Sequence, residues 1–152
     1  MTLLVSSKGP ALSEYVVKAW DIDAAFDNLN KNSKGISSLM KDLSGLTENI
    51  SAAMRAKSLA REPMTEDQIS AFSSFNEIYA GKAAGLASDL DFLTRYFEMG
   101  DKNGIIDDLF AEGADFGMLY GWLMNISQRQ RQAIANINGI ISAARDTLQL
   151  IA

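Results

Sequence analysis

The 152-residue sequence contains neither cysteine nor histidine. These absences exclude disulfides, thiol nucleophiles, zinc sites built on Cys or His, Ser-His-Asp triads and imidazole general bases. Acid-base chemistry would need a strongly perturbed carboxylate or lysine. The sequence also shows no phosphate-binding loop and no cluster of metal ligands. We therefore expect no catalytic residue, no cofactor and no metal, and we predict that the protein is not an enzyme.

Basic residues are few, with 14 Lys plus Arg against 19 Asp plus Glu and a formal net charge of -5. Sequence-independent binding to nucleic acid depends on cationic side chains that meet phosphates, so we expect no nucleic-acid partner. With 47% hydrophobic and 22% charged residues, the composition is that of a globular protein that buries a sizeable core. We predict one helical domain over residues 1–152, with residues 1–10 extended or flexible.

Long apolar runs are absent as well. The most apolar run, residues 116–124, is about half of the roughly 20 residues that a membrane-spanning helix needs. The first ten residues form too short a segment for a cleavable export signal. We expect no membrane span and no cleavable signal peptide, which leaves the compartment open between the cytoplasm and export by a signal-independent route.

Apolar residues recur at spacings of three and four through most of the chain, which predicts an all-α fold, a bundle of four or five helices with a long C-terminal helix. A first amphipathic helix follows Gly9-Pro10 and ends at the polar run 30–35. A second helix with a heptad pattern then runs to the residues before Pro63. The apolar positions of these two helices are Leu12, Tyr15, Ala19, Ile22, Phe26 and Leu29, then Ile36, Leu39, Leu43, Leu46, Ile50, Ala53 and Ala60.

Residues 65–68, Thr-Glu-Asp-Gln, form a capping box, which predicts a third helix from about Glu66 to the glycine-bounded turn 100–104. The middle of this helix has almost no side-chain bulk, because two of its turns consist mainly of alanine, serine and the glycines Gly81 and Gly85. A glycine inside a helix costs about 1 kcal/mol relative to alanine. We infer that something packs very close to this part of the helix.

The last third, from Gly113 to Ala152, reads as one long helix. Polar residues Ser127 and Gln130 interrupt its apolar positions, and two interpretations remain open. In a coiled coil they would lie in the seam and fix register or oligomeric state; otherwise this turn faces water. The expected apolar face consists of Tyr120, Leu123, Ile134, Ile137, Ile141, Ala144, Leu148 and Ile151.

A glycine repeat and an all-round apolar segment begin this last helix. The glycines would let a second backbone approach, either the Gly81/Gly85 face of the same chain or another subunit. Apolar residues that surround a helix predict burial on all sides, in a monomer core or at an interface. The candidate interaction residues are Gly113, Phe116, Gly117, Tyr120, Gly121, Trp122, Gly81 and Gly85.

Residues 101–107, Asp-Lys-Asn-Gly-Ile-Ile-Asp, have the middle of a calcium-binding loop, but Met99 and Phe110 occupy two essential ligand positions. We therefore favour a plain turn before a capped helix. Five acids and one base lie between Asp101 and Asp115. This charge would suit an acidic recognition surface.

Residues 105–132 combine an acidic lead-in, Leu109-Phe110, glycine, a bulky apolar run and the exit Gln128-Arg-Gln-Arg-Gln132. This combination resembles the first helical segment of type III secretion filament and translocator proteins. The resemblance implies a secreted, coiled-coil subunit that polymerises outside the cell and needs a chaperone inside it. It brings no catalytic residue.

The sequence thus predicts a non-enzymatic helical protein, bacterial or from a phage, that acts by protein-protein interaction or by self-assembly as a homo-oligomer. A secretion-related structural subunit is one such protein. The alternative is a monomeric binding or inhibitory module, such as an immunity protein, a phage-encoded inhibitor or a chaperone. In that case the acidic surface would contact the partner, and the glycine face would be buried within the chain.

Overall fold

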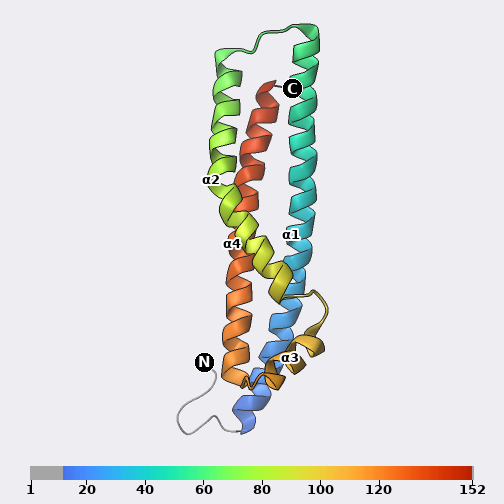
Figure 1. Ribbon diagram of the computed structural model, residues 1–152, viewed down its shortest axis with the longest axis vertical. Helices are drawn as coiled ribbons and strands as arrows, with labels where there is room; N and C mark the ends of the chain where they lie inside the picture. Colours follow the sequence, from blue (N-terminus) through green and yellow to red (C-terminus); the bar gives the residue numbers. More distant parts are fainter. Residues whose placement is uncertain (1–11, 152) are drawn as a thin grey trace. The chain divides into compact units, whose positions relative to one another are not determined.

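The computed structural model describes the backbone of residues 12–151 and the side chains of residues 22–151. This part of the chain is all α-helical: four helices form a bundle, with a long helix at the C-terminus and no strand within 12–151 (Figure 1). The helices are α1 (Leu12–Ala60), α2 (Glu66–Tyr96), α3 (Lys102–Ala111) and α4 (Phe116–Ile151). The predicted fold class is confirmed. The expectations for residues 1–10 lie outside the described residues.

The chain divides into two compact units that are not successive in sequence. Unit 1 contains residues 1–34 and 90–131, and unit 2 contains residues 35–89 and 132–152. Helices α1, α2 and α4 each contribute to both units. The expectation of a single domain stays a prediction. No helix within the described residues has the length and apolarity needed to cross a bilayer.

Helix α1 is continuous over 49 residues, so the predicted break at 30–35 is wrong. The reason is tertiary. Asn30 accepts a hydrogen bond from the backbone of Gly100 (2.9 Å), and Asn32 and Ser33 bond to the buried Gln130 of α4. Polar residues that usually end a helix therefore have partners while the backbone stays helical. A seven-residue repeat of buried positions continues through this stretch: Ile22, Leu29, Ile36, Leu43 and Ile50.

Helix α2 begins where the capping box predicts. The backbone N–H of Gln68 donates to Thr65 Oγ1 (3.2 Å), and the backbone N–H of Thr65 donates to Gln68 Oε1 (3.0 Å). These reciprocal bonds satisfy donors that the first helical turn leaves without partners. The helix ends at Tyr96, earlier than expected, and part of the predicted turn 100–104 belongs to α3, which begins at Lys102.

Helix α4 begins at Phe116, not at Gly113. Gly113 has φ = +91° and lies in the turn after α3, where a left-handed residue is typical of a helix end. Asp115 caps α4, since its Oδ1 accepts a hydrogen bond from the backbone N–H of Met118 (2.8 Å). The predicted row of three glycines on one helical face is therefore reduced to Gly117 and Gly121.

The buried side of α4 is a heptad seam, defined here as the α4 seam, that differs in part from the predicted face. Leu123, Ile137 and Ile141 are buried as expected, whereas Tyr120 and Ile134 are only half-buried. Alternating spacings of four and three are typical of helices that pack as in a coiled coil. The α4 seam comprises Leu119, Leu123, Ile126, Gln130, Ala133, Ile137, Ile140, Ala144, Thr147 and Ile151, all buried.

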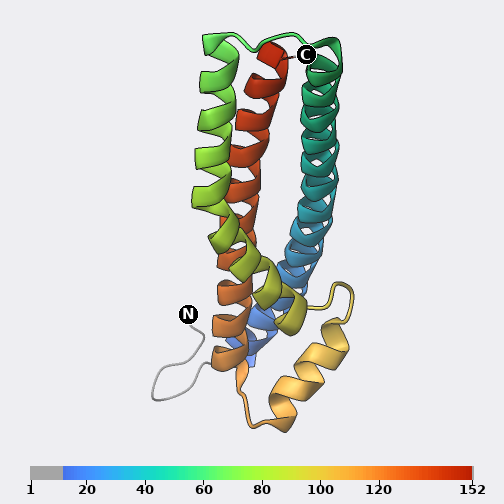
Figure 2. The same cartoon turned by 45° about the horizontal axis from the view of Figure 1, so that its top comes forward.

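Unit 2 is a three-helix arrangement in which the α4 segment lies between the segments of α1 and α2 (Figures 1 and 2). Helix α2 is antiparallel to α4. Gln68 Nε2 donates to the carbonyl of Leu150 (2.9 Å). The hydroxyl of Thr147 shares its proton between the carbonyl of Ala143 in α4 (2.8 Å) and that of Ala71 in α2 (3.3 Å). These bonds hold the start of α2 against the end of α4.

Within the described chain, no neighbour packs very close to α2 at Gly81 or Gly85, so the expected approach is not made by this chain itself. An approach by another subunit stays a prediction. A Cβ at Gly81 would meet no atom within 4 Å, and at Gly85 it would meet only Asn136 Nδ2 at an ordinary 3.7 Å. The close approach in unit 2 occurs at Gly139 instead. There the Lys82 side chain lies across α4, with its Cε 2.8 Å from the position a Cβ would take.

Candidate interaction site in unit 1

Three aromatic side chains from three segments form the centre of unit 1. Phe26 of α1, Phe97 just after α2 and Trp122 of α4 have ring centroids 6.2 to 6.3 Å apart in all three pairs. Such distances are typical of stabilising aromatic pairs. Phe26 and Phe97 are buried, whereas Trp122 is half-buried. The cluster thus fixes the indole of Trp122 while leaving part of it accessible.

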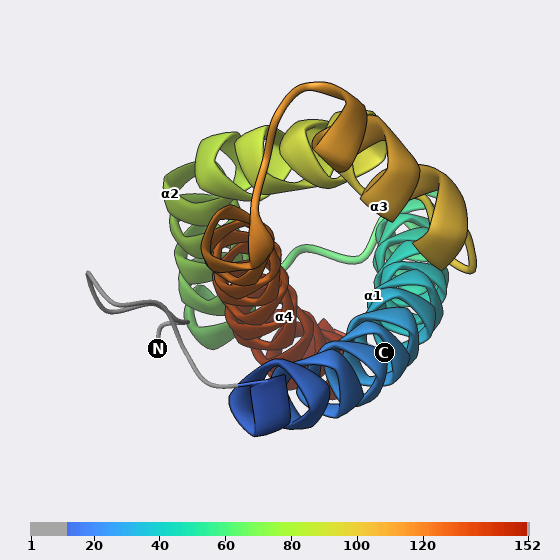
Figure 3. The ribbon, with the colours of Figure 1, turned by 90° about the horizontal axis from the view of Figure 1, so that it is seen from below.

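The position of α3 opens a cavity beside Trp122. Seen from below, α3 leaves the end of α2, and a loop then leads to the start of α4 (Figure 3). Lys102 at the start of α3 forms an ion pair with Asp23 of α1. At the other end, the rings of Phe110 and Phe116 meet edge to face with centroids 5.6 Å apart. These contacts hold α3 at both ends.

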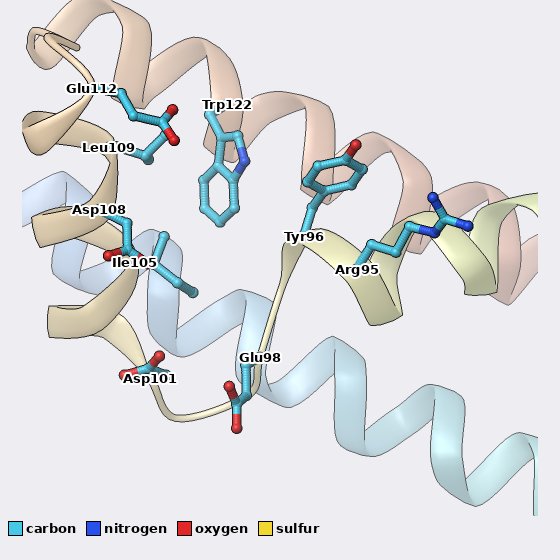
Figure 4. Close-up of a pocket in the computed structure, with 9 residues that line it drawn as sticks. All are labelled: Arg95, Tyr96, Glu98, Asp101, Ile105, Asp108, Leu109, Glu112 and Trp122. Atoms are coloured by element: carbon cyan, nitrogen blue, oxygen red, sulfur yellow. The ribbon is translucent and has the colours of Figure 1, made fainter.

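The cavity has a volume of about 450 Å³, within the range of about 300 to 1,000 Å³ that is common for ligand sites. Trp122 points into it from α4, while Arg95 extends away from the other lining residues (Figure 4). Arg95 forms an exposed ion pair with Asp91 (3.2 Å). The lining consists of Arg95, Tyr96, Glu98, Asp101, Ile105, Asp108, Leu109, Glu112 and Trp122.

Four of the nine lining residues are carboxylates: Glu98 and Asp101 precede α3, Asp108 lies on it, and Glu112 follows its last residue. Three of them, Asp101, Asp108 and Glu112, belong to the acidic segment that the sequence singled out. Within the described residues no group of three His, Cys, Asp or Glu side chains is arranged to hold a metal ion. The cavity therefore combines a negative rim with the aromatic surfaces of Tyr96 and Trp122.

The outward side of α4 in unit 1 is a second accessible feature. Four residues of α4 follow the same spacing as the α4 seam but are shifted by two positions, which is about 200° around the helix axis. They are Gly117, Gly121, Met124 and Gln128. We define these four residues, together with the adjacent exposed Met118, as the α4 outer row. Met124 is 57% exposed, and the neighbouring Met118 is 60% exposed. The described chain by itself therefore does not bury this segment on all sides, and its burial at an interface stays a prediction.

The structure separates the candidate residues that the sequence grouped together. A Cβ at Gly121 or Gly113 would meet no atom within 4 Å, and at Gly117 it would meet only the capping Asp115 (3.3 Å). Phe116 and Tyr120 are half-buried at the sides of α4, and Gly81 and Gly85 are exposed on α2. Trp122 alone lies at the cavity.

Sequence reasoning missed Tyr96 and gave no particular role to Glu112. No spacing pattern could have found them, because their proximity to Trp122 depends on where the ten-residue α3 lies. Comparison with known proteins finds no matching family model, no matching curated protein and no matching solved structure. The resemblance of residues 105–132 to type III secretion subunits stays a prediction.

Proposed function

We propose that this is a non-enzymatic helical protein that acts by binding another protein chain. In the first candidate function, the bound chain is a second copy of the same protein, and the α4 outer row forms the interface. The observation that carries the proposal is Gly121, which lies on the solvent side of α4 between the exposed Met118 and Met124. A glycine inside a helix costs about 1 kcal/mol relative to alanine, and nothing within the described chain packs against this one.

A second helix could use this surface in a simple way. The missing side chain at Gly121 leaves a shallow site for a close backbone approach, and the flexible methionines beside it adapt to an irregular partner. A secretion-related structural subunit, as the resemblance implies, would need a helix surface that binds a second copy of the same chain.

Light scattering across an about hundredfold dilution range tests self-assembly, because mass action makes an oligomer dissociate on dilution. We expect the wild type to associate and the double variant Met118→Glu with Met124→Glu to be monomeric. The matched control is the double variant Leu59→Glu with Ile69→Glu, which places the same two charges on exposed apolar positions in unit 2. A wild type that is monomeric at every concentration would reject self-assembly, and equal effects of both sets of variants would reject the α4 outer row.

The cavity favours a second candidate function, a monomeric binding or inhibitory module. Its four carboxylates would give this module a negatively charged recognition surface for a basic partner. Charge reversal at Asp108 and Glu112 tests this function. Loss of partner binding is expected if the cavity is used, whereas the α4 outer row variants should leave such binding intact.

A further inference from the structure

The cavity of unit 1 has two chemical features that a single ligand group would satisfy together. Tyr96, 54% exposed, and the half-buried Trp122 offer aromatic surface, whereas Asp101, Asp108 and Glu112 supply negative charge. Aromatic faces attract cations through the ring quadrupole, most strongly at tryptophan. The only cation among the lining residues, Arg95, extends away from the others and has an ion-pair partner in Asp91.

We propose that this cavity binds the arginine side chain of a protein partner, an inference that rests on the second candidate function. A guanidinium is planar, stacks on an aromatic ring and donates paired hydrogen bonds to a carboxylate. The indole of Trp122 would take the stacked face of the guanidinium, and the carboxylates of Asp108 on α3 and Glu112 at its C-terminal end would accept the guanidinium N–H groups. The apolar Ile105 and Leu109 would contact the alkyl stem.

The same chain already shows this recognition between its own residues. The guanidinium of Arg129 lies over the ring of Phe92, with its carbon 4.5 Å from the ring centroid. The cavity offers a comparable aromatic surface and adds the carboxylates of Asp108 and Glu112. An ammonium group is a compact, strongly hydrated charge that does not stack, so lysine is expected to bind less tightly.

The experiment titrates the full chain with blocked five-residue peptides that carry arginine, lysine or citrulline at the centre. Citrulline keeps the planar shape without the charge. ¹H–¹⁵N spectra report on the Trp122 indole N–H and on the α3 amides. We expect saturable shifts with the arginine peptide at millimolar concentration, weaker binding of the lysine peptide and no saturation with the citrulline peptide. The affinity for the arginine peptide should fall about threefold or more when the salt concentration is raised.

Matched variants separate the cavity from general charge. Asp107 and Asp108 are adjacent, exposed residues of α3, but only Asp108 lines the cavity. We expect Asp108→Asn to weaken arginine binding about fivefold and Asp107→Asn to change it less than twofold. Tyr96→Leu should also weaken binding, whereas Tyr79→Leu in unit 2 should not. Both tyrosines pack on a phenylalanine four residues earlier, so their structural costs are comparable.

Several results would overturn the inference. The first is the absence of a saturable shift up to about 5 mM arginine peptide, because a site that weak has no useful affinity. The second is equal binding of the citrulline peptide, and the third is an equal effect of Asp107→Asn and Asp108→Asn on arginine binding. Equal affinity for lysine would overturn the arginine assignment. If the arginine peptide does not bind but charge reversal at Asp108 and Glu112 still abolishes binding of a basic protein partner, the second candidate function is kept. Only the arginine inference is then rejected. Self-assembly is tested separately by the α4 outer row variants.

Discussion

Gln130 of α4 donates a hydrogen bond from Nε2 to the backbone carbonyl of Leu29 in α1 at 2.9 Å, with no solvent contact. The same nitrogen donates to Ser33 Oγ (3.0 Å), and Asn32 Nδ2 donates to Gln130 Oε1 (3.2 Å). A polar side chain in a heptad seam is stable only when such partners exist. Its bonds form in one register, so this layer specifies how α1 and α4 pair in unit 1.

We expect Gln130→Ala to lower the free energy of unfolding by about 2 to 4 kcal/mol, because it leaves a cavity and removes the hydrogen-bond partner of Asn32. Urea denaturation followed by circular dichroism measures the change. The control is Gln128→Ala, an exposed residue on the same helix, whose effect should stay within about 0.5 kcal/mol. Equal effects at the two positions would show that the buried layer does not stabilise the fold.

Replacing Gly121 with alanine should raise the free energy of unfolding by about 0.5 to 1 kcal/mol, since the helix interior there has room for a Cβ. Gly113→Ala should have the opposite sign and cost about 1 kcal/mol or more, because φ = +91° disfavours any side chain. Thermal melting of the two variants gives the comparison. A destabilising Gly121→Ala would mean that the glycine is needed for packing within the chain.

Removing the cap of α2 with Thr65→Ala should cost about 1 kcal/mol, because Thr65 Oγ1 accepts the hydrogen bond of the Gln68 backbone N–H. Thr94→Ala is the matched control. Its hydroxyl donates to the carbonyl of Leu90 within the helix, a bond of little value for stability. Chemical denaturation of both variants tests the difference, and indistinguishable midpoints would remove the role assigned to the capping box.

Truncating Phe26 to alanine should destabilise the protein by about 3 to 5 kcal/mol, as the ring is buried and contacts both Phe97 and Trp122. Phe110→Ala removes a partly exposed ring from α3 and should cost clearly less. Differential scanning calorimetry provides the measurement. If Phe110→Ala were the more harmful change, α3 rather than the aromatic cluster would be the main source of stability in unit 1.

The spacing of apolar residues by itself determined that the chain is helical and which side of α1 is largely buried. Ile22, Phe26 and Leu29, like Ile36, Leu43 and Ile50, are buried as their spacing predicts. The capping box also located the start of α2 to the residue. These features are local: apolar side chains at spacings of three and four share a face whatever they pack against, and a cap bonds to residues of its own helix.

Tertiary structure decided the rest. The polar run 30–35 stays helical because Gln130 and the turn at Gly100 supply partners that are distant in sequence. Met118 and Met124 are exposed because the bundle covers only one side of α4 in unit 1. The cavity beside Trp122 exists because α3 lies where contacts with Asp23 and Phe116 hold it. Sequence periodicity carries the direction of a side chain around its own helix, but the neighbours that meet it are set by packing between segments distant in the chain.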